Sequence, residues 1–352
     1  MKDKYGVVLV GCGYIGATHL DDIYYRDNIR IVGVVDINES AARLFARKYG
    51  AESWSTDYNK YLTNDEVDIF IIATYTETHL EILKACISHG KHVLCEKPVA
   101  DTLESSLEFV SAVRNASNSK VLVGHILRHN ESYKTIADMI KNGAIGRPKV
   151  FRMAQNHNAV NWERYRHLLS FCPPLVDCGV HYIDVAQWFT GSKIVQVSGI
   201  STNIDGDVPD GSYNYSMMNA VLADGTVFNY ESGWSRNMMA NNLKEFIGDS
   251  GYIKLILSCD RSDGHELGDL IRWYDGKAGE HHIINVKSIY KDMYGQLLEL
   301  IHMIEEPGYV SSPTIDDVES TMKVAFAADK AVRNNFVLRL DGQTQEIVGG
   351  DR

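Results

Sequence analysis

The sequence predicts an α/β protein of two domains: a doubly wound parallel sheet, then an α+β domain with a large open antiparallel sheet. Over the first third of the chain, short apolar runs alternate with amphipathic helical segments. The run 67–74 (VDIFIIAT) is apolar on both faces, which is typical of a strand covered by helices on both sides. After about residue 124 the pattern changes to strands separated by tight turns. A chain of 352 residues exceeds the usual single domain of about 100–200 residues, and we expect domains at 1–124 and 125–352.

The first domain is expected to contain five strands and four helices in alternation. The predicted strands are 5–11, 30–36, 67–74, 91–98 and 120–125, and the predicted helices are 19–26, 40–50, 78–90 and 102–116. Repeated strand-helix-strand units demand a parallel sheet, because each crossover returns the chain to the same end of the sheet.

The second domain begins with helices and continues with closely spaced strands. Helices are predicted at 130–146, 174–190, 289–306 and 314–334, and strands at 193–202, 212–232, 243–257, 270–276 and 281–287. The links ADGT, GDSG and YDGK are typical of hairpin turns, and they predict antiparallel neighbours. After Phe336 one further short strand is expected, to which the sequence gives no role.

Composition and charge exclude several classes of protein. The net charge is −11, and no basic run is interleaved with aromatic residues, so a nucleic-acid partner is not expected. Apolar runs are of strand length, far short of the roughly 20 residues that span a membrane, and the N-terminus does not resemble a signal peptide. The six cysteines form no CxxC pair, which favours six buried thiols in a reducing cytoplasm.

The sequence GCGYIG, residues 11–16, ends the first strand and opens the first helix. In a dinucleotide-binding Rossmann turn, Gly11 would make the tight turn, Gly13 would admit the pyrophosphate and Gly16 would allow close helix packing. Tyr14 and Ile15 lie in the same loop and are expected at the cofactor.

Asp36 supports this interpretation. It ends the second strand about 20 residues beyond the last glycine, where a carboxylate binds the ribose hydroxyls of NAD and repels the 2′-phosphate of NADP. Two alternatives stay open. Asp36 could cap the following helix, and Arg43, one helical turn further on, could hold the 2′-phosphate of NADP. NAD is the predicted cofactor.

Two segments carry candidate catalytic groups. Glu96, Lys97 and Pro98 end the fifth strand, at the sheet edge where ligands bind, and Pro98 could form a cis peptide bond that aims the lysine. Asp177 and His181, with Asp184 beyond them, stand at i, i+4 and i+7 and would share one helix face.

This pattern suits the oxidation of an alcohol. A histidine can take the hydroxyl proton, and a lysine can stabilise the developing alkoxide. Alternatively, Lys97 could be a solvated loop residue, and His181 could be a histidine that only packs within its helix. A metal site at Asp177, His181 and Asp184 is the weaker interpretation, and none is expected.

Between these two segments lies a stretch rich in aromatic and polar side chains. Such side chains can stack on sugar rings and bond their hydroxyls, although most of them are expected to be structural or solvated. The candidates are Asn156, His157, Trp162, Arg164, Tyr165 and Arg166.

Taken together, GCGYIG, Asp36, CEKPVA and DCGVHYIDVAQW resemble the glucose–fructose oxidoreductase and inositol dehydrogenase family over nearly the whole chain. The resemblance implies that His181 is the acid/base, Lys97 holds the reacting oxygen and Asp177 binds a substrate hydroxyl. It also implies a homo-oligomer, a dimer or tetramer, formed through the open sheet.

Softer matches extend the expected site. ATYTETH stands where the family has ATPxxxH, so Thr74, Tyr75 and His79 are expected by the cofactor, with Tyr75 in place of the usual proline. GHILRHN implies that Arg128 and Asn130 approach the substrate or nicotinamide. Alternatively, Arg128 only pairs with a carboxylate at the domain interface.

The leading hypothesis is therefore an NAD-dependent oxidoreductase that acts on a secondary hydroxyl of a sugar, polyol or glycoside. Oxidation at C3 of a glucoside is a refinement that rests on the resemblance alone. Two alternatives stay open: a glycosidase or lyase that oxidises its substrate transiently, and an NAD-binding sensor without catalysis.

Overall fold

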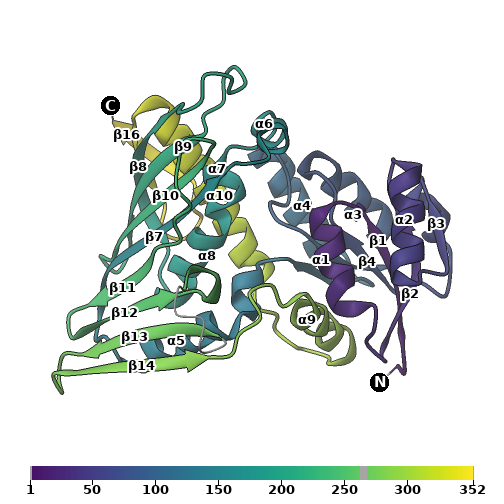
Figure 1. Ribbon diagram of the computed structural model, residues 1–352, viewed down its shortest axis with the longest axis horizontal. Coiled ribbons are helices and arrows are strands. Elements are labelled where there is room, and N and C mark those ends of the chain that lie inside the picture. The colour runs from purple at the N-terminus through teal and green to yellow at the C-terminus, as the bar shows by residue number, and fades with distance from the viewer. Residues whose placement is uncertain (1, 262–267, 352) are drawn as a thin grey trace. The chain divides into compact units, whose positions relative to one another are not determined.

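The computed structural model describes residues 2–261 and 268–351 (Figure 1). The chain divides into two compact units, one made of Met1–His129 with Lys291–Glu319 and the other of Asn130–Tyr290 with Ser320–Arg352. In the described chain, no helix has both the length and the apolar character needed to cross a membrane.

The first unit is built on a six-stranded sheet in which all neighbouring strands are parallel. Its order is β3-β2-β1-β4-β5-β6, so the direction of winding reverses between β1 and β4. The strands are β1 (Tyr5–Val10), β2 (Ile29–Val35), β3 (Ser53–Ser55), β4 (Ile69–Ile72), β5 (His92–Cys95) and β6 (Val121–Val123). The helices between them are α1 (Tyr14–Ile23), α2 (Glu39–Tyr49), α3 (His79–Ser88) and α4 (Leu103–Asn115), with short 3₁₀ turns η1 (Tyr58–Tyr61), η2 (Thr76–Thr78) and η3 (Ile126–His129). The predicted doubly wound sheet is confirmed.

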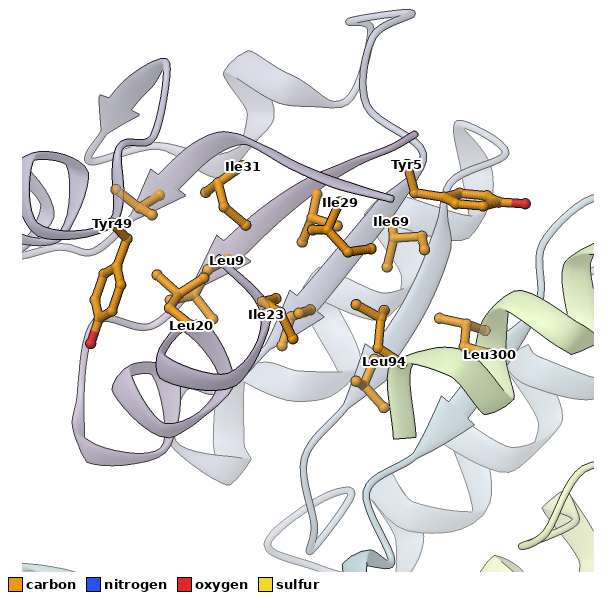
Figure 2. Close-up of a cluster of buried hydrophobic side chains, with 14 of the residues drawn as sticks. Tyr5, Leu9, Leu20, Ile23, Ile29, Ile31, Tyr49, Ile69, Leu94 and Leu300 are labelled. Carbon is orange, nitrogen blue, oxygen red and sulfur yellow. The ribbon is translucent and has the colours of Figure 1, made fainter. Parts of the chain in front are cut away.

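A helix from far along the chain completes the core of this unit. In α9 (Met293–Glu305), Leu297, Leu300 and Ile301 join the apolar cluster formed by strands β1, β4 and β5. Figure 2 shows Leu300 beside Leu94 of β5, with Ile23 of α1 nearby. The predicted boundary assigned everything after residue 124 to the second domain, and so did not include this return of the chain. The pattern of α9 shows an apolar face, but not which sheet will cover it.

The second unit is built on a ten-stranded sheet in the order β14-β13-β12-β11-β7-β10-β9-β8-β15-β16. Its strands are β7 (Pro148–Asn158), β8 (Ile194–Thr202), β9 (Tyr215–Leu222), β10 (Val227–Ser235), β11 (Lys244–Gly248), β12 (Gly251–Ile256), β13 (Asp269–Asp275), β14 (Glu280–Val286), β15 (Val337–Leu340) and β16 (Ile347–Asp351). The three predicted hairpins join β9 to β10, β11 to β12 and β13 to β14.

The large sheet agrees with the predicted fold class, but its strand β7 was not predicted, and two further features differ. All neighbours are antiparallel except β7 and β10, which are parallel. The C-terminal tail forms two strands rather than one, and β15 pairs with β8.

One face of this sheet packs on helices. We call it the helix face: Phe151 of β7 and Phe246 of β11 contact Phe189 of α8 there, with ring centroids 6.4 and 5.1 Å from it. On the opposite face, the open face, Arg152 of β7 and Lys254 of β12 both pair with Glu245 of β11. The helices of this unit are α5 (Glu131–Lys141), α6 (Trp162–Leu169), α7 (Pro174–Asp177) and α8 (Gly179–Thr190). The helix α10 (Ile315–Asn334) begins in the first unit and continues into the second. A 3₁₀ turn η4 (Ser258–Asp260) follows β12.

The predicted helix 174–190 is two helices. Cys178 stands between α7 and α8 with φ −86° and ψ −36°, so the chain stays near helical dihedral angles across the break. Its amide donates to Pro174 O at 3.0 Å and its carbonyl accepts from the His181 amide at 3.2 Å, which closes a tighter turn than an α-helix has.

All six cysteines are free thiols, as expected. Five are buried, but Cys259 is exposed, so the expectation of six buried thiols is wrong at that position. Cys259 lies in the 3₁₀ turn η4 and not in a strand or helix that packs on the core.

Candidate functional site

The carboxyl ends of the parallel strands bring the predicted nucleotide residues to one edge. The amide of Gly11 donates to Val35 O at 2.8 Å, that of Ala73 to Val10 O at 2.8 Å, and that of Glu96 to Ile72 O at 2.9 Å. The residues that follow β1, β2, β4 and β5 are therefore held side by side, where ligands of doubly wound sheets bind.

Each glycine of the first loop has a distinct environment. Gly11 has φ +104°, and a Cβ there would lie 2.5 Å from Ala73 O, so a side chain is excluded twice over. A Cβ on Gly16 would lie 2.0 Å from Gly11 O, because the loop folds directly onto α1. Around Gly13, the N-cap of α1, no described atom comes within 4 Å of the added Cβ. That open side beside helical amides fits the pyrophosphate of a dinucleotide.

Backbone amides fix the orientation of the Asp36 carboxylate. Its Oδ2 accepts from the amide of Cys12 at 2.8 Å, and its Oδ1 accepts from the amide of Asn38 at 2.8 Å. Asn38 is the residue that caps α2, by accepting from the amides of Ser40 and Ala41. The alternative that Asp36 is the helix cap is therefore wrong, and its carboxylate ties the glycine loop to the end of β2.

Arg43, in the helix α2 that follows Asp36 in the sequence, is engaged elsewhere. Arg43 pairs with Glu39 at 2.5 Å and lies 4.6 Å over the ring of Trp54. Ile37, the residue after Asp36, is 95% exposed and offers an apolar surface. A ribose with free hydroxyls fits this carboxylate better than a 2′-phosphate.

The segment after β4 contains Thr74 and Tyr75, and His79 is the first residue of α3. The Thr78 hydroxyl donates to Thr74 Oγ1 at 2.7 Å, and Tyr75 is half exposed. His79 is buried, with Nδ1 3.0 Å from Pro98 O and Nε2 3.1 Å from Thr74 O. Burial lowers the pKa of His79, against the contrary effect of these two carbonyls. His79 therefore joins the loops after β4 and β5, and a contact with the cofactor stays a prediction.

The end of β5 carries the candidate lysine between two fixed residues. The Glu96 carboxylate is 9% exposed and lies 2.7 Å from Nε2 of His19 in α1. Lys97 is half-buried, and the Lys97–Pro98 peptide bond is cis, as the sequence suggested.

Arg128 and Asn130 have structural partners. Nη1 of Arg128 lies 3.2 Å from Asp317 Oδ2 and 3.3 Å from Ser312 Oγ, within the first unit. Asn130 is fully buried; it caps α5 and donates to Ile289 O at 3.2 Å. The expectation that Asn130 approaches a ligand is wrong because both its amide oxygen and its amide nitrogen are used inside the second unit. Arg128 pairs with a carboxylate of its own unit, and its contact with substrate stays a prediction.

Asp177 ends α7, and His181 lies in the first turn of α8. Both are half-buried, whereas Asp184 is almost completely buried. The Cys178 thiol donates to Asp177 Oδ2 at 3.6 Å. Beneath them, Tyr182 of α8 stacks on Tyr230 of β10 with ring centroids 4.9 Å apart. Burial, and then the charges of Cys178 and Asp177, hold the pKa of Tyr230 well above its usual range.

The stretch 156–166 divides between the two faces of the sheet. Asn156 shares the open face with Arg152 by strand alternation, and its amide donates to Glu231 at 2.6 Å. The sequence offered Asn156 as a candidate substrate contact, and that contact stays a prediction. The order of residues in β7 fixes the alternation but not which side α8 covers.

The other candidates of this stretch lie on or near the helix face. His157 Nδ1 is 3.2 Å from the Tyr165 hydroxyl, and the Tyr165 ring is 5.5 Å from Trp234. Trp162 is buried and donates to Asp207 at 2.8 Å, so it packs within the unit. Arg164 is exposed on α6.

Sequence reasoning missed three buried polar groups on the helix face. The Tyr230 hydroxyl and Trp234 Nε1 are buried without a hydrogen-bond partner among the described residues. Lys244 of β11 is 0% exposed; it donates to Ala154 O at 3.2 Å and lies 5.1 Å from the centre of the Tyr182 ring. The alternation in 228–234 places Phe228, Tyr230 and Trp234 on one face, which was the available signal.

Two family models match the chain. One describes an oxidoreductase family with an NAD-binding Rossmann fold and covers residues 5–125. The other describes the GFO/IDH/MocA C-terminal domain and covers residues 133–254.

Individual relatives match over nearly the full length. "Inositol 2-dehydrogenase 2" of Saccharopolyspora erythraea is 28% identical over 326 residues, which is 91% of this chain and 90% of the relative. An aldose-aldose oxidoreductase from Caulobacter crescentus, solved with glycerol, has a TM-score of 0.81 at 20% identity and covers 96% of this chain and 100% of its own. A Desulfitobacterium hafniense protein, provisionally described as an NADPH-dependent oxidoreductase, has a TM-score of 0.83 at 18% identity over 96% of this chain and 98% of its own.

At these identities the two solved structures show a common fold and nothing finer. The two family models together span most of the chain, and their order matches the parallel sheet followed by the large sheet. The chain therefore belongs to the GFO/IDH/MocA family of oxidoreductases, with an NAD-binding Rossmann domain at its N-terminus.

Proposed function

We propose that this protein is an NAD-dependent dehydrogenase that oxidises a secondary hydroxyl of a polyol or sugar to a ketone, or reduces the ketone. One observation carries the proposal: Gly11, Asp36 and Lys97 follow the carboxyl ends of β1, β2 and β5, at one edge of the sheet. Such an edge can bind a dinucleotide with its reactive ring near an ammonium group.

NAD rather than NADP is the proposed cofactor. The Asp36 carboxylate is fixed by the amides of Cys12 and Asn38, with lone pairs left to accept from ribose hydroxyls. A 2′-phosphate would meet that negative charge, and Arg43 is committed to Glu39 and Trp54.

The catalytic roles assign one task to each group. When bound, NAD accepts the hydride that leaves the substrate carbon. His181 removes the hydroxyl proton, so that the C–H bond breaks as the C=O bond forms. The Lys97 ammonium stabilises the developing negative oxygen, and Asp177 accepts a hydrogen bond from a neighbouring substrate hydroxyl. In the reverse direction His181 returns the proton.

The substrate class rests on the relatives. The Saccharopolyspora protein is an inositol 2-dehydrogenase by name, and inositol is a ring polyol with secondary hydroxyls only. His157 and Tyr165 offer hydrogen-bonding and aromatic surface on the helix face, which suits such a ring. A cyclic polyol is therefore the first substrate to test, and C3 of a glucoside is the second.

The test is a screen of cyclic polyols, aldoses and glycosides with saturating NAD, followed by NADH absorbance. We expect NADH with at least one substrate and a marked preference for NAD over NADP. Turnover of a glycoside without NADH accumulation would favour transient oxidation by a glycosidase or lyase. Tight NAD binding without turnover of any substrate would favour a sensor.

The proposed base is tested directly by His181→Ala. We expect kcat to fall by about a hundredfold or more, the usual contribution of a general base, with NAD affinity retained. His167→Ala, which removes an exposed histidine of the same unit, is the matched control and should be neutral. Activity within a fewfold of normal in His181→Ala would contradict the assigned role.

We further propose a cytoplasmic homo-oligomer. Six free thiols suit a reducing compartment. The open face carries paired charges at Arg152, Glu245 and Lys254 beside the exposed apolar Ile283, and it can meet a second copy. Light scattering after size exclusion should give a dimer or tetramer, and Arg152→Glu should shift the distribution towards monomer.

A further inference from the structure

The residue before the candidate lysine is a buried carboxylate with one side-chain hydrogen-bond partner among the described residues. Glu96 is 9% exposed, and Nε2 of the completely buried His19 lies 2.7 Å from its Oε1. A carboxylate only accepts, so His19 Nε2 carries the proton of this bond. The other ring nitrogen, Nδ1, has no hydrogen-bond partner among the described residues. The ring therefore serves Glu96 and no other hydrogen-bonding side chain in the described chain.

The charges around Glu96 come from several elements. Burial raises its pKa, but the hydrogen bond and charge of His19 and the charges of Lys97 and Lys291 outweigh burial, so the pKa of Glu96 lies below its usual range. His79 and Cys95 also lie within electrostatic reach of the carboxylate. Glu96 therefore remains a negative charge beside Lys97, and the hydrogen bond from His19 is the largest of the effects that lower its pKa.

The residue after the lysine is held in a parallel way. His79, the first residue of α3, lies 3.0 Å from Pro98 O through Nδ1 and 3.1 Å from Thr74 O through Nε2. Lys97 is thus flanked by two residues that buried imidazoles fix, one from α1 and one from α3. We call His19 with Glu96, and His79 with Pro98, the histidine brace.

We propose that the histidine brace positions Lys97, and that His19 acts by keeping Glu96 ionised and fixed beside the lysine. This inference rests on the proposed function, since it deepens the role given to Lys97. His19 and His79 are positioning residues, because neither is placed against substrate.

The brace also joins the lysine to the nucleotide loop. His19 lies in α1, whose N-cap Gly13 borders the proposed pyrophosphate site. A helix that holds the phosphate at its first turn therefore holds Glu96 at its second turn. A displaced α1 would carry the carboxylate with it, so correct seating of the cofactor and correct placement of Lys97 depend on the same helix.

The test compares His19→Leu, His19→Gln, Glu96→Gln and the double variant His19→Leu/Glu96→Gln. Without its donor, the buried carboxylate should take up a proton near neutrality, because burial then dominates. In His19→Leu we expect kcat to fall about tenfold to a hundredfold at pH 6, the range for losing a hydrogen bond to a buried charge, and to recover as the pH rises. NAD affinity, followed by NADH fluorescence titration, should change less than about threefold, since this is a kcat effect.

Conservative and combined variants separate positioning from folding. The amide of Gln reaches about as far as Nε2 of His, so His19→Gln should restore most of the rate. The double variant should be no slower than Glu96→Gln, because His19 acts through Glu96. His89→Gln, at the exposed residue that caps the C-terminus of α3, is the control and should match the unaltered protein. A loss in His19→Leu that is independent of pH, or additive losses in the double variant, would overturn the inference.

A second readout does not need a substrate. Acylation of Lys97 by an amine reagent can be followed by peptide mass spectrometry against pH. Loss of the Glu96 charge removes stabilisation of the ammonium, so Glu96→Gln should be acylated at least about tenfold faster near neutrality. An unchanged acylation rate would count against the brace. If acylation responds but no polyol is oxidised by any variant, the proposed function fails and the brace stands.

Discussion

Two glycines of the nucleotide loop stand two positions apart and differ in what a side chain would meet. Gly11 has φ +104° and a backbone carbonyl 2.5 Å from the place of its Cβ. Gly13 has φ −90° and no described neighbour within 4 Å of that place. The first glycine is needed for the fold, whereas the second leaves room for a ligand.

Substitution by alanine should separate these roles. Gly11→Ala should lower the free energy of unfolding by about 1–3 kcal/mol through strain and should also abolish NAD binding. Gly13→Ala should change stability by less than about 0.5 kcal/mol, while its methyl group obstructs the pyrophosphate and weakens NAD about tenfold or more. Urea denaturation and NADH fluorescence measure the two effects. Equal NAD affinity in Gly13→Ala and the unaltered protein would contradict this account.

Asp36 combines a structural and a proposed recognition role in one carboxylate. Asp36→Asn keeps an acceptor for one backbone amide but removes the charge that would bind ribose and repel a phosphate. We expect NAD to bind about ten- to a hundredfold more weakly, which is the loss typical of charged hydrogen bonds. The affinity for NADP should fall much less. Titration with both nucleotides measures the ratio. An unchanged ratio of the NAD and NADP affinities would show that the role of Asp36 is structural only.

At the scale of elements, β11 places a charged side chain where the sheet needs an apolar one. Lys244 faces the helix side with Phe246, and burial lowers its pKa to about 7. The groups that face it are Asp260, Cys259 and Cys178 together with the Tyr182 ring. Asp260 raises the pKa slightly, but burial dominates because the amine has one carbonyl partner at 3.2 Å.

This lysine predicts a pH-dependent stability. Because the folded-state pKa is below the unfolded value of 10.5, the unfolded chain binds more protons between about pH 7 and 10.5. Stability should therefore rise with pH across that window relative to Lys244→Met, by a few kcal/mol in all. The Met variant should be the more stable protein at pH 7. Urea denaturation at pH 7 and pH 9.5 measures this difference, and parallel behaviour of the two proteins would show that burial does not lower the pKa of Lys244.

At the scale of the whole molecule, each unit is assembled from two separate stretches of chain. The nucleotide unit takes Lys291–Glu319 from beyond the large sheet, and α9 fills its core with Leu297 and Leu300. The folding of the nucleotide unit therefore depends on residues that follow most of the second unit in the sequence.

Leu300→Ala tests this dependence. Leu300 is fully buried, and removal of its side chain should cost about 2–5 kcal/mol. Hydrogen exchange should show faster opening of β1, β4 and β5, with the strands of the large sheet protected as before. Leu44→Ala, at an exposed leucine of α2, is the control for the same substitution. Faster exchange confined to the large sheet would contradict the assignment of α9.

Local patterns in the sequence were sufficient for most elements and for one edge of the site, but they did not predict β3, β7, α6 or β16. Alternating apolar runs and helices require a parallel sheet, and parallel strands end at one edge, so the glycine loop, Asp36 and Lys97 could be expected together before any coordinates. The Rossmann unit, the hairpins of the large sheet and the family followed from that local information.

Tertiary structure alone decided where segments distant in sequence meet. It assigned α9 to the nucleotide unit, made β7 and β10 parallel neighbours, and turned Asn156 to the open face. It also brought His19 to Glu96 and buried Lys244. The physical reason is the same each time: periodicity shows that a face is apolar or that side chains alternate, but the surface that covers that face is chosen by the packing of the whole chain.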